Sequence, residues 1–339
     1  MRMSKHEIRT TSEDYPIDFV IPWVDGSDDA WLKERSEYSP VNTGDARVQR
    51  FRDMGLLRYW FRGVEDYAPW VNKIYFITWG HVPSWLNITN EKLIVVNHRD
   101  YIPGKYLPTF SSHTIELNIH RIEGLSEHFV YFNDDVFLTK PTSREDFFVG
   151  GLPCDCLIES AITPRLGEFS SILCETVGVI NKHFKKSDIT SQKFRGYLNP
   201  IYGPLNIRSL SVSPYKYIMG FYNHHIQQSH LKSTFEQVWK EEFEELDRTC
   251  NNKFRDKNDV NQYLMRYWNL CCGQFVPNKP IGKSVHIEED VGSLTRELKN
   301  NKVLCINDTE VVDDFVSKTA ELKSLFDVML PAASTFEIN

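Results

Sequence analysis

A strand-like segment that ends on two adjacent carboxylates constrains this chain more than any other feature. Within residues 128–139, the large apolar side chains of residues 129–132 predict a buried strand, which stops at Asn133, Asp134 and Asp135 before apolar residues resume. Two buried carboxylates are costly unless something compensates their charge. In open α/β sheets, ligands bind at the carboxyl ends of strands, and paired acidic oxygens suit a hard divalent cation that holds a substrate phosphate. The ordinary alternative is a helix cap or an Asx turn that closes the strand.

Strand-like and helical stretches alternate through the first half of the chain. Apolar runs predict strands at residues 17–23, 73–78, 92–97 and 129–132, and polar–apolar spacing predicts helices at residues 28–37, 54–67 and 111–123. Strands that alternate with helices are typical of a parallel sheet with helices on both faces. We therefore expect an α/β fold built on a Rossmann-like, mostly parallel sheet.

The second half of the chain is predicted to be more helical. Amphipathic patterns indicate helices at residues 231–246, 258–272 and 311–330, and short strands at residues 283–287 and 302–306. No clear linker separates the halves, so we expect a single domain over residues 1–339. Residues 17–150 would form its α/β half, residues 151–280 a helical insertion packed on the sheet, and residues 281–330 a return to the core.

Composition and missing motifs argue against several classes of protein. The chain has 39 basic and 46 acidic residues, a formal net charge of −7, which gives no support for nucleic-acid binding. The sequence lacks a Walker loop, a strand-linked G-x-G-x-x-G and a G-x-S-x-G elbow, which argues against a P-loop ATPase, a Rossmann dehydrogenase and an α/β-hydrolase. It also lacks an apolar export region and any run of about 18 apolar residues. We expect a cytoplasmic protein without a transmembrane segment, with peripheral association at the inner face of the membrane left open.

Polar residues around the first strand are candidates for a nucleotide site. Asp18, Asp25 and Asp28 surround this strand, and Gly26 allows a tight turn with positive φ that can face backbone N–H groups toward a ligand. An ordinary strand-to-helix connection would have the same sequence.

A basic cluster precedes the helix predicted at residues 54–67. Arg47, Arg50 and Arg52, with Asp53 beside them, offer planar guanidinium groups that can grip a phosphate through two donors. Solvation of a helix start is the simpler explanation for this cluster taken alone.

The helix predicted at residues 111–123 carries several ionisable side chains. His113, Glu116 and His120 have spacing that places them on one helical face, next to Arg121. That face could supply a base, a metal ligand or a phosphate contact. A structural zinc site is the weaker alternative because the H-E-x-x-H motif is absent.

Further candidates lie in the second half of the chain. His224 and His225 precede one predicted helix, and Arg255 precedes the next. Histidine changes charge near neutral pH, which suits it to proton transfer, although neighbouring histidines in a loop are more often incidental. Asp308 follows the strand predicted at residues 302–306 and repeats the strand-then-acid pattern of the first half.

These segments together closely resemble the Stealth family, the sugar-phosphate transferases of bacterial capsule synthesis, which include the catalytic part of the animal lysosomal-enzyme GlcNAc-1-phosphotransferase. Four blocks occur in the family order and cover most of residues 17–310. Their best-matched parts are Ile17-Asp-Phe-Val-Ile-Pro-Trp-Val-Asp-Gly-Ser-Asp28, Leu107-Pro-Thr-Phe-Ser-Ser-His-Thr-Ile-Glu116, Phe132-Asn-Asp-Asp-Val-Phe137, His225 through Lys232-Ser-Thr234, and Cys305-Ile-Asn-Asp308. After His225 comes Ile-Gln where the family often has Met-Pro, so the choice between His224 and His225 stays open.

The resemblance implies a GT-A-like fold and a specific reaction. A hexose 1-phosphate, with N-acetylhexosamine 1-phosphate as the expected group, would pass from a UDP-sugar to a hydroxyl of a growing surface polysaccharide. The product would be a phosphodiester, and UMP would leave. A divalent cation would assist, with Mg²⁺ expected and Mn²⁺ as the alternative. The acceptor would be an oligosaccharide or a lipid-linked glycan, with residues 17–150 binding the nucleotide and residues 151–280 the acceptor.

The resemblance also implies roles for individual residues. The cation would be held by Asp134, Asp135 and Asp308. The nucleotide pocket would be formed by Asp18, Trp23, Asp25, Arg50, Arg52, His120 and Arg121. Catalysis would involve Asp134, Asp135, His225 as the base for the acceptor hydroxyl, Arg255 as the group that stabilises phosphate charge, and Glu116 in support.

Two other functions remain compatible with these residues. A metal-dependent glycosyltransferase also uses acid pairs at strand ends, but it breaks the bond at the anomeric carbon and releases UDP. A non-catalytic carbohydrate-binding protein is the third hypothesis. The sequence does not identify the donated sugar, the acceptor hydroxyl, the oligomeric state, or whether the enzyme polymerises or adds one unit.

Overall fold

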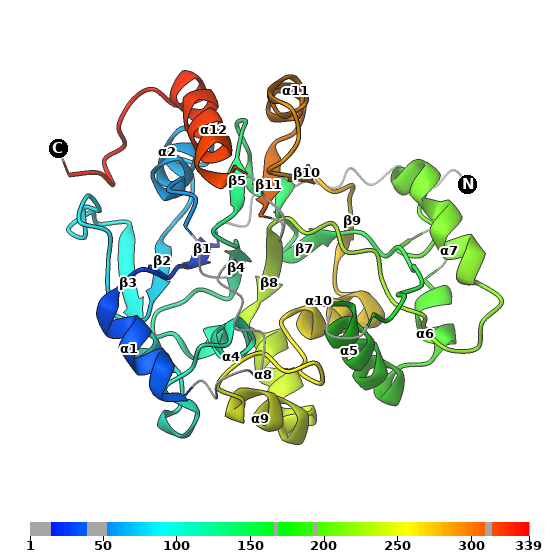
Figure 1. The fold of residues 1–339 in the computed structure, drawn as a ribbon. Helices are drawn as coiled ribbons and strands as arrows, with labels where there is room; N and C mark the ends of the chain where they lie inside the picture. The colour runs from blue at the N-terminus through cyan, green and yellow to red at the C-terminus, as the bar shows by residue number, and fades with distance from the viewer. Residues whose placement is uncertain (1–14, 39–52, 166–168, 193–194, 309–313, 339) are drawn as a thin grey trace.

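The computed structural model describes residues 15–38, 53–165, 169–192, 195–308 and 314–338. A five-stranded sheet with the order β3-β2-β1-β4-β8 forms its centre (Figure 1). The strands are β1 Ile17–Pro22, β2 Ile74–Thr78, β3 Leu93–Asn97, β4 His128–Tyr131 and β8 Gln228–Leu231. β1 to β4 run parallel, and β8 is antiparallel to β4. The predicted α/β fold with a mostly parallel sheet is confirmed.

Both faces of this sheet are buried. Phe19 and Ile21 of β1 belong to one apolar cluster, whereas Val20 belongs to a second cluster on the opposite face. β4 alternates in the same way, with Val130 in the first cluster and Phe129 in the second. Because neighbouring residues of a strand point to opposite faces, two-sided burial produces the continuous apolar runs seen in the sequence.

Helices cover each face of the sheet. The first cluster includes side chains of α2 Leu57–Tyr67, α11 Val291–Asn300 and α12 Phe315–Met329. The second includes side chains of α3 His98–Tyr101, α4 Ser112–Leu117, α5 Phe169–His183, α6 Lys186–Thr190, α8 Lys232–Glu241, α9 Phe243–Asn251 and α10 Tyr263–Cys272. The other helices are α1 Asp29–Tyr38 and α7 Asn206–Val212. None of the helices in the described part of the chain is both long enough and apolar enough to cross a bilayer.

The expectation of one continuous helix over residues 111–123 is wrong. α4 ends at Leu117, and a separate 3₁₀ turn follows at Ile119–Arg121. The side-chain amide of Asn118 donates to the carbonyl of Thr114 at 2.8 Å, and such side-chain bonds compete with the helical backbone bonds. The predicted common face of Glu116 and His120 is therefore lost.

Two smaller sheets extend the centre. β5 Val136–Leu138, β10 Gly282–His286 and β11 Val303–Asn307 form the order β10-β11-β5, with β11 antiparallel to β5. β6 Phe148–Val149, β7 Leu152–Asp155 and β9 Val276–Pro277 form the other sheet. Residues 151–280 thus supply β7, β8 and β9 as well as helices α5 to α10, and β8 lies in the central sheet.

Asp18 ties the starts of three strands together at the amino edge of the sheet. Its Oδ1 accepts hydrogen bonds from Nδ2 of Asn72 at 2.7 Å and from the backbone N–H of Lys73 at 3.1 Å. Its Oδ2 accepts from the backbone N–H of Ser126 at 2.8 Å. These partners precede β2 and β4, and the side chain is fully buried. The carboxylate is therefore compensated by the protein itself.

We expect the substitution Asp18→Ala to lower the free energy of unfolding by roughly 2–4 kcal/mol, because it leaves buried donors without their charged acceptor. Urea denaturation followed by tryptophan fluorescence measures this change. Asp66→Ala, at an exposed position of α2, is the matched control and should stay within about 0.5 kcal/mol. Unchanged stability of Asp18→Ala, combined with loss of UDP-sugar binding, would instead support the predicted nucleotide contact.

Buried histidines should make the fold sensitive to acid. Burial lowers the pKa of His98 and of His120 to about 3, and that of His230 to about 4, from the ordinary 6.5. At pH values between the lowered pKa of the folded protein and the ordinary pKa of the unfolded chain, the unfolded chain binds more protons than the folded protein. The free energy of unfolding should therefore fall as the pH drops from about 6.5 toward about 4.

Urea unfolding at a series of pH values from about 7.5 to 4.5 measures this slope. His230→Leu should make the loss of stability with falling pH smaller. His286→Leu, at an exposed position, should leave the slope as it is. An unchanged slope in His230→Leu would show that burial of this imidazole does not contribute.

Candidate active site

Strand register brings three loop ends together at the carboxyl edge of the central sheet. Tyr131 of β4 pairs with Gln228 of β8, so the residues before β8 lie beside those that follow β4. Cys305 of β11 pairs with Val136 of β5, the strand that begins directly after the acidic pair. Ligands bind at this edge in open α/β sheets. The antiparallel pairings therefore deliver side chains from distant parts of the chain to the ends of the parallel strands.

Asp135, His225 and Cys305 meet at this edge. Nε2 of His225 lies 3.9 Å from Oδ2 of Asp135, and one ligand atom from each of the three residues lies within 4.8 Å of the others. Oδ1 of Asp135 is buried and has no hydrogen-bond partner among the described residues. Carboxylate, imidazole and thiol are all ligands of divalent metals, so the cluster fits a divalent cation. The predicted ligand set overlaps it at Asp135.

The acidic pair lies in a concentration of negative charge. Burial raises the pKa of Asp134 to about 7, and the neighbouring Asp135 and Asp53 carboxylates add to the shift, whereas Arg255 opposes it. Surrounding protein atoms crowd the carboxyl, but Asp134 as a whole residue is still exposed, so water screens part of this repulsion. Burial also raises the pKa of Asp135. Such a centre attracts cations and phosphate-bound metal ions.

The two adjacent histidines are directed to different places. His225 has φ of 46°, in the left-handed region that few residues other than glycine adopt. Its ring faces Asp135, and 38% of its side chain is exposed. The ring of His224 instead lies 3.9 Å from Asp155, with 10% of its side chain exposed. Only His225 therefore faces the acidic pair.

Arg255 lies in a loop that a buried pair of side chains, His113 and Asp259, holds in place. Its Nη2 donates to Oγ of Ser112 at 2.6 Å. The fully buried Asp259 accepts from the backbone N–H of Asp256 at 2.8 Å, and the same oxygen lies 3.0 Å from Nδ1 of His113. His113 and Asp259 thus fix the loop that carries Arg255, and His113 has a structural partner.

Glu116 reaches the same region through β4. Its side chain is buried, and its Oε1 accepts a hydrogen bond from the Tyr131 hydroxyl at 3.4 Å. In the described part of the chain, Oε2 of Glu116 has no hydrogen-bond partner. Burial, with the charges of Glu116 and Asp134, raises the pKa of Tyr131 well above its ordinary value, and Arg255 opposes this shift. Tyr131 therefore connects Glu116 electrostatically with the acidic pair and Arg255.

The end of β1 contributes an aromatic wall. The ring of Trp23 stacks on Phe76 with centroids 5.8 Å apart and meets the edge of His81 at 5.4 Å. Among the residues the structure describes, the buried Nε1 of Trp23 has no acceptor. The backbone N–H of Asp25 donates to Nε2 of His81 at 2.8 Å, and hydrogen bonds from Ser27 hold the pKa of Asp25 below its ordinary value. A nucleotide contact by Trp23 and Asp25 stays a prediction.

His120 and Arg121 pack against α8. The ring of His120 lies beside Phe235 and Trp239, and the guanidinium of Arg121 lies 4.8 Å from the centre of the Trp239 ring. These contacts give both residues structural partners away from the acidic pair.

The remaining predicted residues lie at other places. Asp18 sits at the amino edge of the sheet, opposite Asp134 and Asp135. Asp308 directly follows β11 at the carboxyl edge, whereas Arg50 and Arg52 fall outside the described residues. Their roles in nucleotide or metal binding stay predictions.

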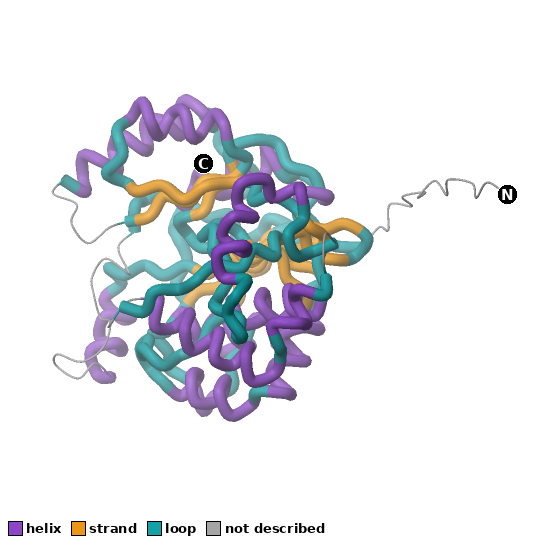
Figure 2. The backbone as a smooth tube through the Cα atoms, turned by 90° about the vertical axis from the view of Figure 1, so that its right-hand side faces the viewer, coloured by secondary structure: helices purple, strands orange, loops and turns teal. Residues whose placement is uncertain are grey.

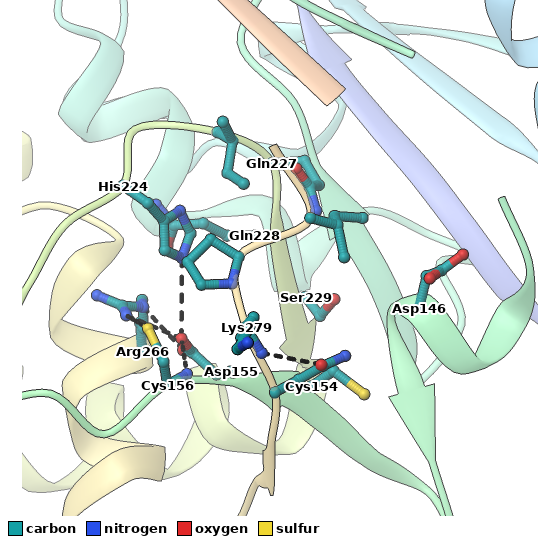
Figure 3. A pocket seen from close by; sticks show the side chains of 14 residues that line it. Asp146, Cys154, Asp155, Cys156, His224, Gln227, Gln228, Ser229, Arg266 and Lys279 are labelled. Carbon is teal, nitrogen blue, oxygen red and sulfur yellow. Dashed lines mark hydrogen bonds and ion pairs between the residues drawn. The ribbon is translucent and has the colours of Figure 1, made fainter. Parts of the chain in front are cut away.

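A second polar pocket adjoins the site (Figure 3). Nε and Nη2 of Arg266 donate to the two carboxylate oxygens of Asp155, each at 2.8 Å. Burial favours a raised pKa for Asp155, but the Arg266 guanidinium and His224 hold it well below its ordinary value. Asp155, Cys156 and His224 could also be read as a metal site. The guanidinium already neutralises Asp155 and would repel a cation, so this pocket suits neutral polar groups.

Sequence reasoning missed Cys305, Tyr131 and the pair of Asp155 with Arg266. Cys305 and Tyr131 lie inside apolar runs, which indicate only a buried strand. Asp155 and Arg266 are 111 residues apart in the chain, and neither stands in a recognisable motif. The pairing of β11 with β5 is the signal that would have located Cys305, and it is not readable from one sequence.

We expect Arg266→Met to lower the free energy of unfolding by about 3–5 kcal/mol, because it leaves the Asp155 carboxylate buried without its partner. Adding Asp155→Leu should recover much of this loss in urea denaturation. Arg248→Met, which breaks an exposed pair with Glu245, is the control and should cost at most about 1 kcal/mol. Equal losses in Arg266→Met and Arg248→Met would contradict the buried-pair interpretation.

Solved structures offer distant likenesses. The galactosyltransferase LgtC in complex with donor and acceptor sugar analogues is 12% identical, with a TM-score of 0.39, over 94% of this chain and 98% of that chain. The apo-form glycosyltransferase GlyE of Streptococcus pneumoniae TIGR4 is 9% identical, with a TM-score of 0.40, over 93% of this chain and 62% of that chain. Scores this low carry no argument about the chemistry.

Family models and sequence relatives are more specific. Residues 15–40 match Stealth protein CR1, conserved region 1, and residues 50–153 match Stealth protein CR2, conserved region 2. The capsular polysaccharide phosphotransferase WcwK of Streptococcus pneumoniae is 41% identical over 327 residues, 95% of this chain and 98% of the relative. The exopolysaccharide phosphotransferase cps2G of Lactiplantibacillus plantarum is 40% identical over 96% of this chain and 98% of the relative. This chain therefore belongs to the Stealth family of polysaccharide phosphotransferases and is a transferase.

Proposed function

We propose that the protein transfers a hexose 1-phosphate, with N-acetylhexosamine 1-phosphate as the expected group, from a UDP-sugar to a hydroxyl of a growing surface polysaccharide. The acceptor oxygen bonds to the sugar-bearing phosphorus, and the bond from that phosphorus to the oxygen bridging the two phosphates breaks. UMP leaves, and the product is a phosphodiester. The observation that carries this proposal is the approach of His225 to Asp135 at the end of β4, next to Asp134, whose charge Arg255 stabilises.

His225 is the proposed base for the acceptor hydroxyl. Its imidazole is partly exposed, and Asp135 lies 3.9 Å away, where a carboxylate stabilises the imidazolium formed when the ring takes the proton. His224 is buried beside the neutralised Asp155, so it is less suited to this task. The polar pocket next to His225 encloses only about 30 Å³, so the acceptor sugar would lie at its opening and not inside it. The Oε1 atoms of Gln227 and Gln228, which have no hydrogen-bond partner in the described ranges, offer acceptors for sugar hydroxyls.

Arg255 and a divalent cation would neutralise the charge on the transferring phosphate. Positioning and charge neutralisation supply most of the catalysis in phosphoryl transfer. A bound cation would act as a Lewis acid on the phosphate oxygens. Asp134, Asp135 and Asp308 are the proposed ligands because Mg²⁺ prefers carboxylate oxygens and a neutral buried thiol such as Cys305 is a poor ligand for it. This set leaves Nε2 of His225 free to accept a proton.

The reaction is tested by incubating the protein with Mg²⁺, UDP-N-acetylglucosamine or another UDP-sugar, and an acceptor oligosaccharide. We expect UMP and a phosphodiester product in equal amounts, measured by chromatography and ³¹P NMR. His225→Gln should lower kcat by about 10²–10⁴-fold with a small change in the KM for the donor, because general-base catalysis contributes about that much. His286→Gln is the matched control. Release of UDP would instead support glycosyl transfer, and absence of turnover with every UDP-sugar would support a binding protein.

The metal ligands are tested by titrating the apo-protein with Co²⁺. We expect binding without a thiolate-to-cobalt charge-transfer band, and Asp135→Ala should weaken it at least tenfold while the fold is kept. A strong band that disappears in Cys305→Ser would contradict this ligand set. It would assign the cation to Asp135, His225 and Cys305, and it would remove His225 as the base.

A further inference from the structure

Helix α7 has two of its three aliphatic side chains on the solvent side, whereas the third, Val212, is buried. Ile207 and Leu210 are 68% and 53% exposed. Ser209, on the same helix, is fully buried, where its Oγ accepts a hydrogen bond from the backbone N–H of Glu159 at 2.9 Å. Water-exposed aliphatic residues beside an inward serine reverse the usual amphipathic pattern. Folding alone does not explain this arrangement.

Further exposed apolar side chains precede and follow α7 in the chain. We call the set the apolar face, and it consists of Ile201, Ile207, Leu210, Tyr215 and Tyr217, all of which are exposed. α7 lies at the right-hand edge of Figure 1, far from the central sheet, so this part of the molecule faces the viewer in Figure 2. Grouped apolar side chains of this kind mark interaction sites more often than scattered ones do.

The chain segment that carries the apolar face has charges of one sign. Residues 189–235 contain no Asp or Glu, although 46 of the 339 residues of the chain are acidic and the formal net charge is −7. Exposed basic side chains of this segment include Arg195, Arg208 and Lys216. A locally basic surface on an acidic protein calls for a partner that is both apolar and anionic.

We propose that the apolar face docks the protein on an anionic lipid surface. Aliphatic and tyrosine side chains bordered by Lys and Arg are typical of segments that lie in the interface of a bilayer. Juxtaposed basic residues add electrostatic attraction to anionic lipids. Docking of a protein partner is the other outcome that the test below distinguishes.

The apolar face is connected to the active site by a short, hydrogen-bonded segment. Backbone N–H groups of Ser160 and Tyr222 donate to the carbonyls of Gly220 and Ile158, at 3.1 Å and 2.8 Å. Eight residues lead from Tyr217 to His225, which span at most about 28 Å. A docked protein would therefore hold its active site near lipid-linked glycans. This consequence rests on the proposed function, whereas lipid binding itself does not.

Flotation of the full-length protein with vesicles tests the proposal. We expect binding to vesicles of phosphatidylglycerol and phosphatidylcholine, weaker binding to phosphatidylcholine alone, and release by high salt. The double variant Ile207→Ser/Leu210→Ser should lower the partition coefficient at least tenfold, and Tyr215→Ser/Tyr217→Ser should also lower it. Lys216→Gln should reduce the preference for anionic lipid. Circular dichroism and thermal unfolding check that each variant is folded.

Val316→Ser/Val328→Ser is the matched control, because these valines of α12 are 78% and 84% exposed outside the basic segment. It should bind vesicles as the unmodified protein does. Equal loss in this control, or no binding of the unmodified protein to anionic vesicles, would overturn the proposal. So would a dimer, detected by sedimentation, that Ile207→Ser/Leu210→Ser dissociates in place of any lipid binding. Vesicle binding requires no turnover, so its result is independent of whether UMP is released.

Discussion

The uncompensated charge at the end of β4 is the constraint on which the rest of the site depends. Asp134 and Asp135 follow a strand that is buried on both faces, and burial raises the pKa of each carboxyl. The structure brings His225 and Arg255 near this charge but leaves one oxygen of Asp135 without a partner among the described residues. If the pair served only to form a turn, we would expect hydrogen-bond donors for its carboxylate oxygens. Asp18, at the other edge of the sheet, has such donors for both of its oxygens.

The contrast between Asp135 and Asp155 separates the candidate reactive centre from a structural ion pair. Two hydrogen bonds from the Arg266 guanidinium neutralise the charge of Asp155, so this carboxylate is not available to a ligand cation. Asp135 has an imidazole at 3.9 Å instead, a group that can gain or lose a proton. The left-handed backbone at His225 makes this division possible, because it sends two adjacent histidines to two different carboxylates. The polar pocket lined by His224 and Asp155 therefore lies beside a charged centre that suits phosphate and metal, while its own lining suits neutral polar groups.

Much of the architecture could be predicted from the sequence, because a strand that is buried on both faces requires a continuous run of apolar residues. The four parallel strands lie within one or two residues of their predicted bounds. The end of the helix expected at residues 111–123 could not be predicted. It depends on the Asn118 side chain, which donates to the Thr114 carbonyl and so competes with a helical backbone hydrogen bond. β8 was not expected as a strand, since Gln228–Leu231 is short and its partner lies about a hundred residues earlier in the chain.

The sequence by itself determined the sheet and the family, and it proposed the acidic pair as the centre of the candidate site, because these depend on local patterns and on motifs in a fixed order. Only the tertiary structure decided which side chains meet there. The antiparallel pairing of β8 with β4 and of β11 with β5 brings His225 and Cys305 to Asp135, while Asp18 lies at the opposite edge and His120 packs against α8. Such contacts are set by long-range register, and a one-residue shift of register would turn each side chain to the other face of the sheet.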